Sequence, residues 1–234
     1  MQLSVAGSRE FCGVHGHMIN TLIHVIYPPQ CRACDAIIAP SDIFCLFCTG
    51  QIKPIVTLYL PVSKTISMPV FAISAYVQPL RQMVLKKFYG DRLASRQLGR
   101  LALTMTPLKM ESFDVVVPVP LHWTRYAWRG FNQACEMGAA VAHARGVPLV
   151  RFLARTRRTT FQSRLTAEER RKNVSQVFGI SPWYRWWGAD AIRDKHVLLV
   201  DDLCTTGATL SQAAKIIAKH KPASITALVA CRAV

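Results

Sequence analysis

One stretch near the carboxyl end of this 234-residue sequence combines residue types that bind phosphate and sugar hydroxyl groups. Two adjacent carboxylates are followed by a leucine, a cysteine and a Thr-Thr-Gly-Ala-Thr segment. That segment lies between an apolar run and an amphipathic one, which predicts a turn from a buried strand into a helix. Backbone N–H groups and the helix dipole favour an anion at such a turn, the glycine lets the backbone approach closely, and threonine hydroxyls add donors. We therefore expect a terminal phosphate to bind at Thr205, Thr206, Gly207, Ala208 and Thr209.

The two carboxylates, Asp201 and Asp202, stand at the predicted end of the strand, directly before this turn. They would repel a bound phosphate unless another group compensates for their charge. The hydroxyls of a vicinal diol on the same ligand would do so by donating hydrogen bonds to the carboxylates, and a magnesium ion could neutralise the remaining charge. Ribose 5-phosphate carries this combination of groups.

Other uses of the same residues explain less of the sequence. An aspartate pair that only caps a helix would account for one carboxylate and not for the threonine-rich segment. A phosphoacceptor-aspartate domain would also place carboxylates and magnesium at a strand end, but it does not require a phosphate-binding turn. The sequence lacks a Walker lysine and a dinucleotide-binding glycine pattern, which argues against a nucleoside triphosphate or nicotinamide site.

Four of the eight cysteines form two C-x-x-C pairs separated by about ten residues, namely Cys31, Cys34, Cys45 and Cys48. This spacing is typical of two knuckles that supply four thiolates to one tetrahedral zinc ion. Because protein would fill all four positions, no place remains for a catalytic water, and we expect the zinc to be structural. Metal binding would stabilise a segment too small to form its own core. The alternative is a coincidental group of buried cysteines.

The remaining sequence must supply the elements that position these groups. Short β-rich apolar runs alternate with longer amphipathic runs, which predicts an α/β fold with a doubly wound parallel sheet of about four or five strands. The predicted strands are Val70–Val77, Asp114–Val119, His196–Val200 and Ile225–Cys231. The predicted helices are one that starts near Pro79, Gln133–Arg145 with Gly146 at its end, and Leu210–His220. The arginine-rich stretch Arg151–Phe178 predicts a basic loop and then a short helix capped by Thr166 and Glu169.

Length and composition fit one α/β domain with a small appendage. With 51% hydrophobic residues, the chain can form a packed core. We predict an N-terminal extension over residues 1–17, a zinc-ribbon-like segment over 18–55 and the large domain over 65–234. No run approaches the roughly 18–20 uninterrupted apolar residues that a membrane-spanning helix needs, and the first residues lack the pattern of a secretory signal. We therefore expect a cytoplasmic protein with no membrane span.

The formal net charge of +16 favours polyanions: nucleic acid, acidic membrane surfaces or phosphorylated metabolites. A basic stretch could follow a nucleic-acid backbone, and nearby tryptophans could stack on unpaired bases, so single-stranded DNA is a candidate partner. These residues are Arg151, Arg155, Arg157, Arg158, Arg164, Arg170, Arg171, Trp183, Trp186 and Trp187. The alternatives are an exposed basic face that only keeps the protein soluble and ordinary packing tryptophans.

Two further arginines, Arg125 and Arg129, follow the predicted strand Asp114–Val119. Doubly wound folds bind ligands at this edge of the sheet, so both guanidinium groups could contact a pyrophosphate. The alternative is a solvated loop.

The run Val197–Thr209 resembles the ribose-phosphate-binding motif of type I phosphoribosyltransferases. In that family two acidic residues hold the ribose hydroxyls and the following loop binds the 5-phosphate. The resemblance implies these roles for Asp201, Asp202 and Thr205–Thr209.

Further motifs are similar to the ComF family, also called GntX-like, and together they cover most of residues 18–234. They are Tyr27-Pro28-Pro29 with the cysteine knuckles, Leu85–Asp91, Pro118–Leu121, Arg129–Gln133 and the set Gln162, Leu165, Arg170 and Asn173. The sequence departs from that family in the aromatic stretch Ser181–Trp187 and in the extension before Met18. The resemblance implies a zinc-bearing N-terminal segment, a phosphoribosyltransferase fold and a role in natural transformation or in the use of external DNA.

Two functions follow as hypotheses. The first is a cytoplasmic factor for DNA uptake or DNA utilisation that binds single-stranded DNA, keeps a ribose-5-phosphate pocket and could work with the DNA-uptake machinery. The alternative is an active phosphoribosyltransferase that uses phosphoribosyl pyrophosphate and magnesium to glycosylate a nitrogen base. In that enzyme Asp201 and Asp202 would steady the ribose as positive charge develops at its anomeric carbon.

Overall fold

The computed structural model describes residues 27–40, 42–63, 66–85, 91–121, 126–127, 130–155, 177–184 and 189–233. The chain divides into two compact units between Thr49 and Gly50. Within the described ranges, no helix combines the length and apolar character needed to cross a membrane.

The small unit consists of tight backbone turns around the cysteines. The first cysteine pair lies in a turn closed by an antiparallel bridge between Gln30 and Ile37. Inside it, the Cys31 N–H donates to the Ala36 carbonyl oxygen at 2.7 Å. The second pair lies at the start of the short helix α2 (Leu46–Gly50). Each pair therefore occupies a local turn that keeps its two sulfurs together.

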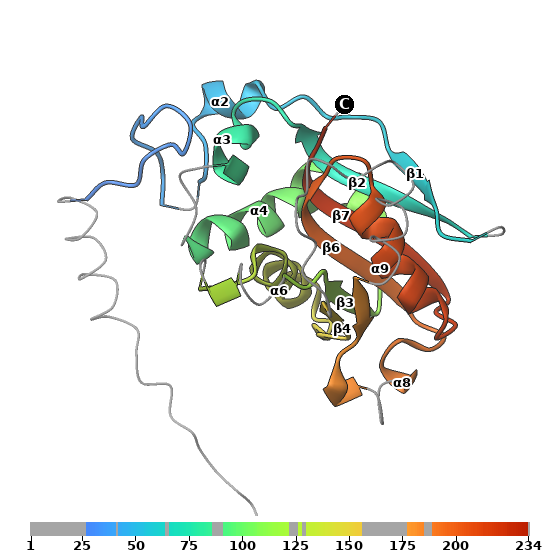
Figure 1. Cartoon of the computed structure of the whole chain (residues 1–234). Helices are drawn as coiled ribbons and strands as arrows, with labels where there is room; N and C mark the ends of the chain where they lie inside the picture. The colour runs from blue at the N-terminus through green and yellow to red at the C-terminus, as the bar shows by residue number, and fades with distance from the viewer. Residues whose placement is uncertain are drawn as a thin grey trace, which may run out of the picture. The chain divides into compact units, whose positions relative to one another are not determined.

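The large unit is built on a five-stranded sheet with the order β1-β2-β7-β6-β3 (Figure 1). Its strands are β1 (Leu58–Pro61), β2 (Ser67–Ala75), β3 (Val115–Pro118), β6 (His196–Cys204) and β7 (Ser224–Arg232). The pairings β2–β7, β7–β6 and β6–β3 are parallel, and only the edge strand β1 is antiparallel to its neighbour in this sheet. A second, two-stranded antiparallel sheet joins β4 (Leu153–Arg155) to β5 (Phe178–Ile180).

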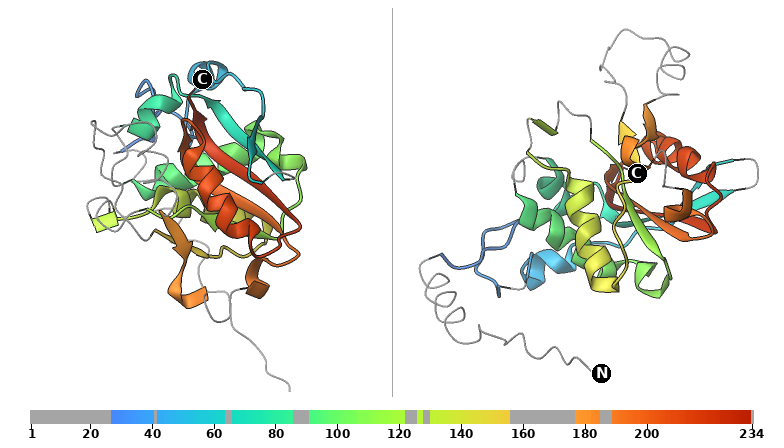
Figure 2. Two further views of the ribbon diagram at one scale, coloured as in Figure 1. Left: turned by 45° about the vertical axis from the view of Figure 1, so that its right-hand side comes forward. Right: turned by 90° about the horizontal axis from the view of Figure 1, so that it is seen from below.

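Helices cover both faces of the main sheet. On one face, α6 packs on β3 and β6, and α4 packs on β2 and β7, whereas α9 packs on β6 and β7 from the other side (Figure 2). The described helices of this unit are α3 (Leu80–Leu85), α4 (Arg92–Met105), α6 (Gln133–Arg145), α8 (Ala189–Ile192) and α9 (Ala208–Ala218), with 3-10 turns at Pro107–Met110 and Pro182–Tyr184. The predicted α/β class and doubly wound, mostly parallel sheet are confirmed.

Local capping residues set the helix ends that matter for the site. The Asp91 carboxylate accepts the Ala94 N–H at the start of α4, and the Asn132 side chain accepts the Ala134 N–H at the start of α6. Gly146 ends α6 in the left-handed conformation, with φ of 66°. The predicted bounds of this helix are confirmed, because its capping residues are local sequence signals.

The strand order reverses next to β3 and β6. After β3 and α6 the chain returns on the outer side of β3, where Leu149 forms a parallel bridge to Val116. β6 lies on the other side of β3. Doubly wound sheets bind ligands where the strand order reverses in this way.

Several elements differ from the sequence prediction. β6 continues beyond the predicted end at Val200, because its ladder with β7 runs to the pair Cys204 and Arg232. The predicted first strand, Val70–Val77, is shifted to β2 at Ser67–Ala75. The antiparallel strand β1 and the helix α4 were not predicted, and β4 and β5 lie at the ends of the stretch predicted as a basic loop. The predicted short helix at Thr166 and Glu169 lies outside the described residues.

Gly99 allows α4 to pack closely on α6, since a Cβ built at this position would overlap the backbone oxygen of Met137. We expect Gly99→Ala to lower the free energy of unfolding by about 1–3 kcal/mol, although alanine alone would favour the helix by about 1 kcal/mol. Urea denaturation would measure the change. The exposed Arg100→Ala should stay within about 0.5 kcal/mol of the parent. Equal stability of Gly99→Ala and the parent would contradict this packing.

Candidate functional site

The turn after β6 presents a helix start to solvent. Thr205–Gly207 form the turn, and the first hydrogen bond of α9 runs from the Ser211 N–H to the Gly207 carbonyl oxygen at 2.9 Å. The N–H groups that precede this bond therefore point out of the helix end. The Ala208 N–H donates a hydrogen bond to Thr206 Oγ1 at 3.4 Å. Thr205, Thr206, Ala208 and Thr209 are exposed, so backbone and hydroxyl donors are accessible to an anion.

Two features favour glycine at position 207: its backbone angle and its contact with Leu60. Its φ is +74°, in the left-handed region that glycine adopts at little cost. A Cβ at this position would also lie 2.6 Å from Cδ1 of Leu60, a buried residue of the edge strand β1. The backbone of the turn thus rests on the Leu60 side chain, in addition to the close phosphate approach that the sequence suggested.

Asp201 and Asp202 lie in the last part of β6, where the strand changes from fully buried to partly exposed. Asp201 Oδ1 accepts the Asp202 N–H at 2.9 Å. Burial raises the pKa of Asp201 well above its usual range, and the charge of Asp202 raises it further. The Asp202 N–H and the charge of Arg155 act in the opposite direction. Hydroxyl donors or a cation at this carboxyl group would favour its ionised form.

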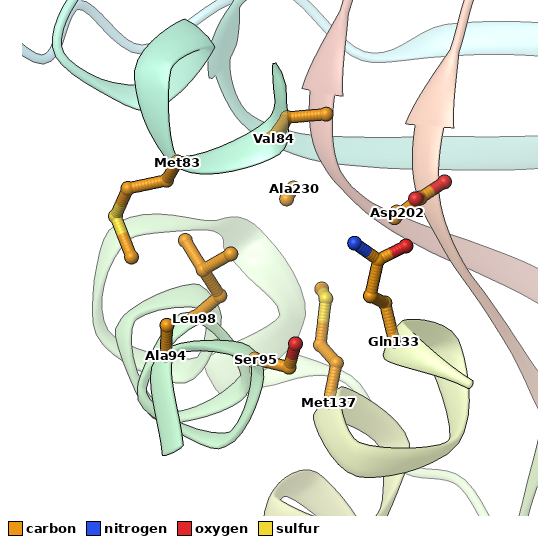
Figure 3. Close-up of a pocket in the computed structure, with 9 residues that line it drawn as sticks. All are labelled: Met83, Val84, Ala94, Ser95, Leu98, Gln133, Met137, Asp202 and Ala230. Atoms are coloured by element: carbon orange, nitrogen blue, oxygen red, sulfur yellow. The ribbon is translucent and has the colours of Figure 1, made fainter. Parts of the chain in front are cut away.

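Asp202 faces a small pocket between the sheet and the helices, and the Gln133 amide group points toward it (Figure 3). Apolar side chains from α3, α4 and α6 form most of the remaining wall, among them Met83, Leu98 and Met137. The pocket has a volume of about 20 Å³, enough for about one water molecule. A sugar ring must therefore approach the carboxylates from the exposed end of β6.

Arg155, which the sequence placed among arginines for a nucleic-acid backbone, has an electrostatic effect on this site because its charge lowers the pKa of Asp201. It lies in β4, its charge acts on Asp201, and its guanidinium stands 5.7 Å from the centre of the Phe178 ring. No local pattern in the sequence pairs positions 155 and 201. Gln133 was noted only as part of a motif, and its burial at the start of α6 was not predicted. Arg125 and Arg129 lie outside the described residues.

In the small unit, the predicted cysteine cluster is formed. The four sulfur atoms of Cys31, Cys34, Cys45 and Cys48 lie within 4.8 Å of one another, and those of Cys34 and Cys45 are 3.6 Å apart. Sulfurs around one tetrahedral zinc ion would be about 3.8 Å apart. Burial opposes ionisation of Cys31, but backbone N–H groups of Cys45, Ala33 and Cys34 outweigh it and lower the pKa of Cys31 to about 6, whereas burial and the neighbouring thiols raise the pKa of Cys48. The sulfur positions, and not these pKa values, indicate a metal site. The four close cysteines could therefore hold a metal ion.

Replacing the Asp201 carboxylate by an amide should stabilise the free protein. The folded state holds a proton on Asp201 at pH values where the unfolded chain has lost it, so this group lowers stability as pH rises above about 4. We expect Asp201→Asn to increase the free energy of unfolding at pH 7 by an amount on the order of 1 kcal/mol, and the gain to vanish toward pH 4. Urea denaturation across this range, without magnesium or phosphorylated ligands, would measure it.

The exposed Asp190→Asn is the matched control, because it removes the same charge from a helix surface. Asp190→Asn should change the free energy of unfolding at pH 7 by less than about 0.5 kcal/mol. If Asp201→Asn lowered the free energy of unfolding at pH 7, the folded protein without ligand would stabilise the Asp201 carboxylate. That result would contradict the conclusion that burial raises the pKa of Asp201.

The sequence is similar to a known domain family and to several known proteins. Residues 142–233 match the family described as phosphoribosyl transferase domain. Competence protein F of Haemophilus influenzae is 30% identical over 63% of this chain, and the match spans 65% of that protein, slightly less than two thirds. DNA utilization protein YhgH of Salmonella typhi is 29% identical over 69% of this chain and 70% of its own length. Competence protein ComFC of Bacillus subtilis is 28% identical over 62% of this chain and 56% of its own length. With the mostly parallel α/β sheet and the four-cysteine cluster, these matches support a ComF-type protein with a phosphoribosyltransferase domain of type I.

Proposed function

We propose that this ComF-type protein binds the ribose 5-phosphate part of phosphoribosyl pyrophosphate and acts in the cytoplasm in the uptake or utilisation of DNA. One observation supports this choice of ligand: a turn with N–H and hydroxyl donors directly follows two carboxylates at the end of one buried strand. The role in DNA uptake or utilisation is supported by the names of the relatives, which are competence and DNA utilization proteins. The DNA-uptake machinery is the corresponding partner.

The ligand would lie across the exposed end of β6. Its phosphate would accept hydrogen bonds from the start of α9 and from the threonine hydroxyls, and its two ribose hydroxyls would donate to Asp201 and Asp202. Arg155 would limit the negative charge beside the sugar. A magnesium ion, when bound with the pyrophosphate, would supply positive charge that the carboxylates and phosphates share.

Arg125 and Arg129 are the residues we assign to the pyrophosphate. The assignment rests on their position after β3, at the edge of the sheet where doubly wound folds bind ligands. If transfer to a nitrogen base occurs, Asp201 and Asp202 would stabilise the positive charge that develops at the anomeric carbon.

Single-stranded DNA is the macromolecular partner that the exposed side chains favour. Trp183 is 83% exposed, which does not fit a tryptophan that packs in the core. Exposed aromatic rings near arginines bind unpaired bases by stacking. Arg151 is also exposed, at the start of the arginine-rich stretch.

We assign structural zinc to the four-cysteine cluster. Thiolate ligands and the sulfur spacing suit zinc, and a site closed by four protein ligands has no position for a reacting water. The segment bounds 18–55 and the domain bounds 65–234 remain predictions from sequence.

Calorimetric titration of phosphoribosyl pyrophosphate with magnesium into the zinc-loaded protein would test the ligand. We expect binding by the parent, and a loss of about a hundredfold in the Asp201→Asn, Asp202→Asn double variant, because two charge-assisted hydrogen-bond acceptors are weakened. Asp190→Asn should bind as the parent does. Absence of binding to the parent would mean that the fold is a reused scaffold without this ligand.

Metal analysis of the purified chain would test the zinc assignment. We expect about one zinc ion per chain, as the tetrahedral four-thiolate geometry requires. Cys34→Ser should lose the metal and lower the temperature at which the small unit unfolds. Cys135→Ser, a buried cysteine of the other unit, should keep the metal. A chain that is stable without metal and has four reactive thiols would contradict the assignment.

A further inference from the structure

A second, larger pocket lies beyond the carboxyl end of β3, outside the turn that receives the 5-phosphate. Its volume is about 400 Å³, which lies within the roughly 300–1,000 Å³ typical of sites for small organic ligands. The segment after β3, the start of α6 and the chain around β4 form its walls. The residues that matter here are Arg92, Pro120, Tyr126, Phe131, Arg151 and Arg155.

The charge on the walls of this pocket is positive. Three arginines line it, against one carboxylate among the lining residues, Glu136. That carboxylate already lies 2.7 Å from Nε of Arg96, which is not a lining residue, and 3.9 Å from Nε of Arg92. The pocket therefore has an excess of positive charge and suits an anionic group.

The same pocket offers flat apolar surface beside its cations. The Tyr126 side chain is 49% exposed, and Pro120 and Phe131 line the pocket with it. The Arg92 guanidinium stands 5.9 Å from the centre of the Phe131 ring. Aromatic and apolar faces next to guanidinium groups are the surfaces on which nucleobases stack.

Hydrogen bonds hold the walls in place without a ligand. The Gly130 N–H donates to the Tyr126 carbonyl oxygen at 2.7 Å, and Arg92 donates to the Gly130 carbonyl oxygen at 3.1 Å. The Asn132 amide donates to the Val119 carbonyl oxygen at 2.9 Å. These hydrogen bonds join the described parts of the pocket walls to one another.

From this arrangement we infer that the pocket binds one nucleotide, with its phosphate on Arg151 and Arg155 and its base on Tyr126 and Pro120. The nucleotide comes from a single DNA strand or from the free pool. The inference rests on the proposed function and deepens it, because this pocket would hold one nucleotide of the single-stranded DNA proposed above as a partner. The nucleotide and the ribose 5-phosphate would bind at different places, the first in this pocket and the second at the turn after β6.

Two probes test this inference: thymidine monophosphate by calorimetry and a short fluorescein-labelled oligothymidylate by anisotropy. In the parent, at least one probe should bind. Arg151→Gln should weaken binding about tenfold, because a charge-assisted hydrogen bond is lost, and Tyr126→Ala should weaken it by a similar factor through loss of stacking. Both changes are at exposed side chains, so folding should be preserved, which thermal unfolding would verify. The control is Arg100→Gln, which removes an equal charge from α4 at a residue that does not line the pocket. It should change the affinity for either probe by less than about twofold.

The pattern of binding identifies the source of the nucleotide. Tight, salt-sensitive binding of the oligonucleotide with weak binding of the monophosphate identifies a DNA strand, and similar affinities identify a free nucleotide. The inference is overturned if neither probe binds the parent, if both bind Arg151→Gln and Tyr126→Ala as they bind the parent, or if ribose 5-phosphate displaces the probe.

Titration of phosphoribosyl pyrophosphate into the same variants separates this inference from the proposed function. Arg151→Gln should keep most of its affinity for phosphoribosyl pyrophosphate while losing nucleotide affinity. If the parent binds the oligonucleotide but not phosphoribosyl pyrophosphate, the proposal of a ribose 5-phosphate site is wrong. The inference of a nucleotide-binding pocket would still be supported.

Discussion

The large unit depends on the burial of β6, which lies between β3 and β7 and is covered by helices on both faces. From Val197 to Val200 every side chain is buried, so hydrophobic packing and two parallel ladders fix this strand. The side chains from Asp201 to Leu203 are partly exposed, and the proposed contacts to the ribose and its 5-phosphate lie between Asp201 and the start of α9. The packed strand thus positions two carboxylates and the start of α9 at the carboxyl end of β6, next to that of β3.

The pair Asp201 and Asp202 lowers the stability of the free protein at the position proposed to bind the ribose. A carboxyl group at Asp201 loses hydration and stands beside a second carboxylate, so its ionisation is opposed in the free protein. The same burial raises the pKa of the Cys231 thiol to about 12, with a smaller contribution from Asp202. Residues chosen only for stability would be apolar or amide at these positions. A ligand with hydroxyl donors and a cation would reverse this cost, which couples binding to stability.

The parts that could be predicted from sequence are those set by local signals. β3 and the first half of β6 are continuous apolar runs, α6 is bounded by Asn132 and Gly146, and the cysteine pairs carry their own turns. The effect of the Arg155 charge on Asp201 and the contact of Leu60 with the backbone at Gly207 depend on tertiary packing between distant segments. β1 was missed for a related reason. Its four residues alternate weakly between buried and exposed, and only pairing with β2 makes them a strand.

Leu60 has a consequence for how this protein could be divided or altered. The match to the phosphoribosyl transferase domain starts at residue 142, and the ligand-binding motif starts at Asp201, yet the floor of the phosphate turn comes from β1. A fragment that began at residue 65 would contain every proposed ligand contact and lack this floor. The edge strand is therefore a place where substitutions can tune the shape of the turn, and with it ligand affinity, while the binding motif itself stays unchanged. Sequence drift in an apparently peripheral strand would then alter function in a way that comparison of motifs alone does not detect.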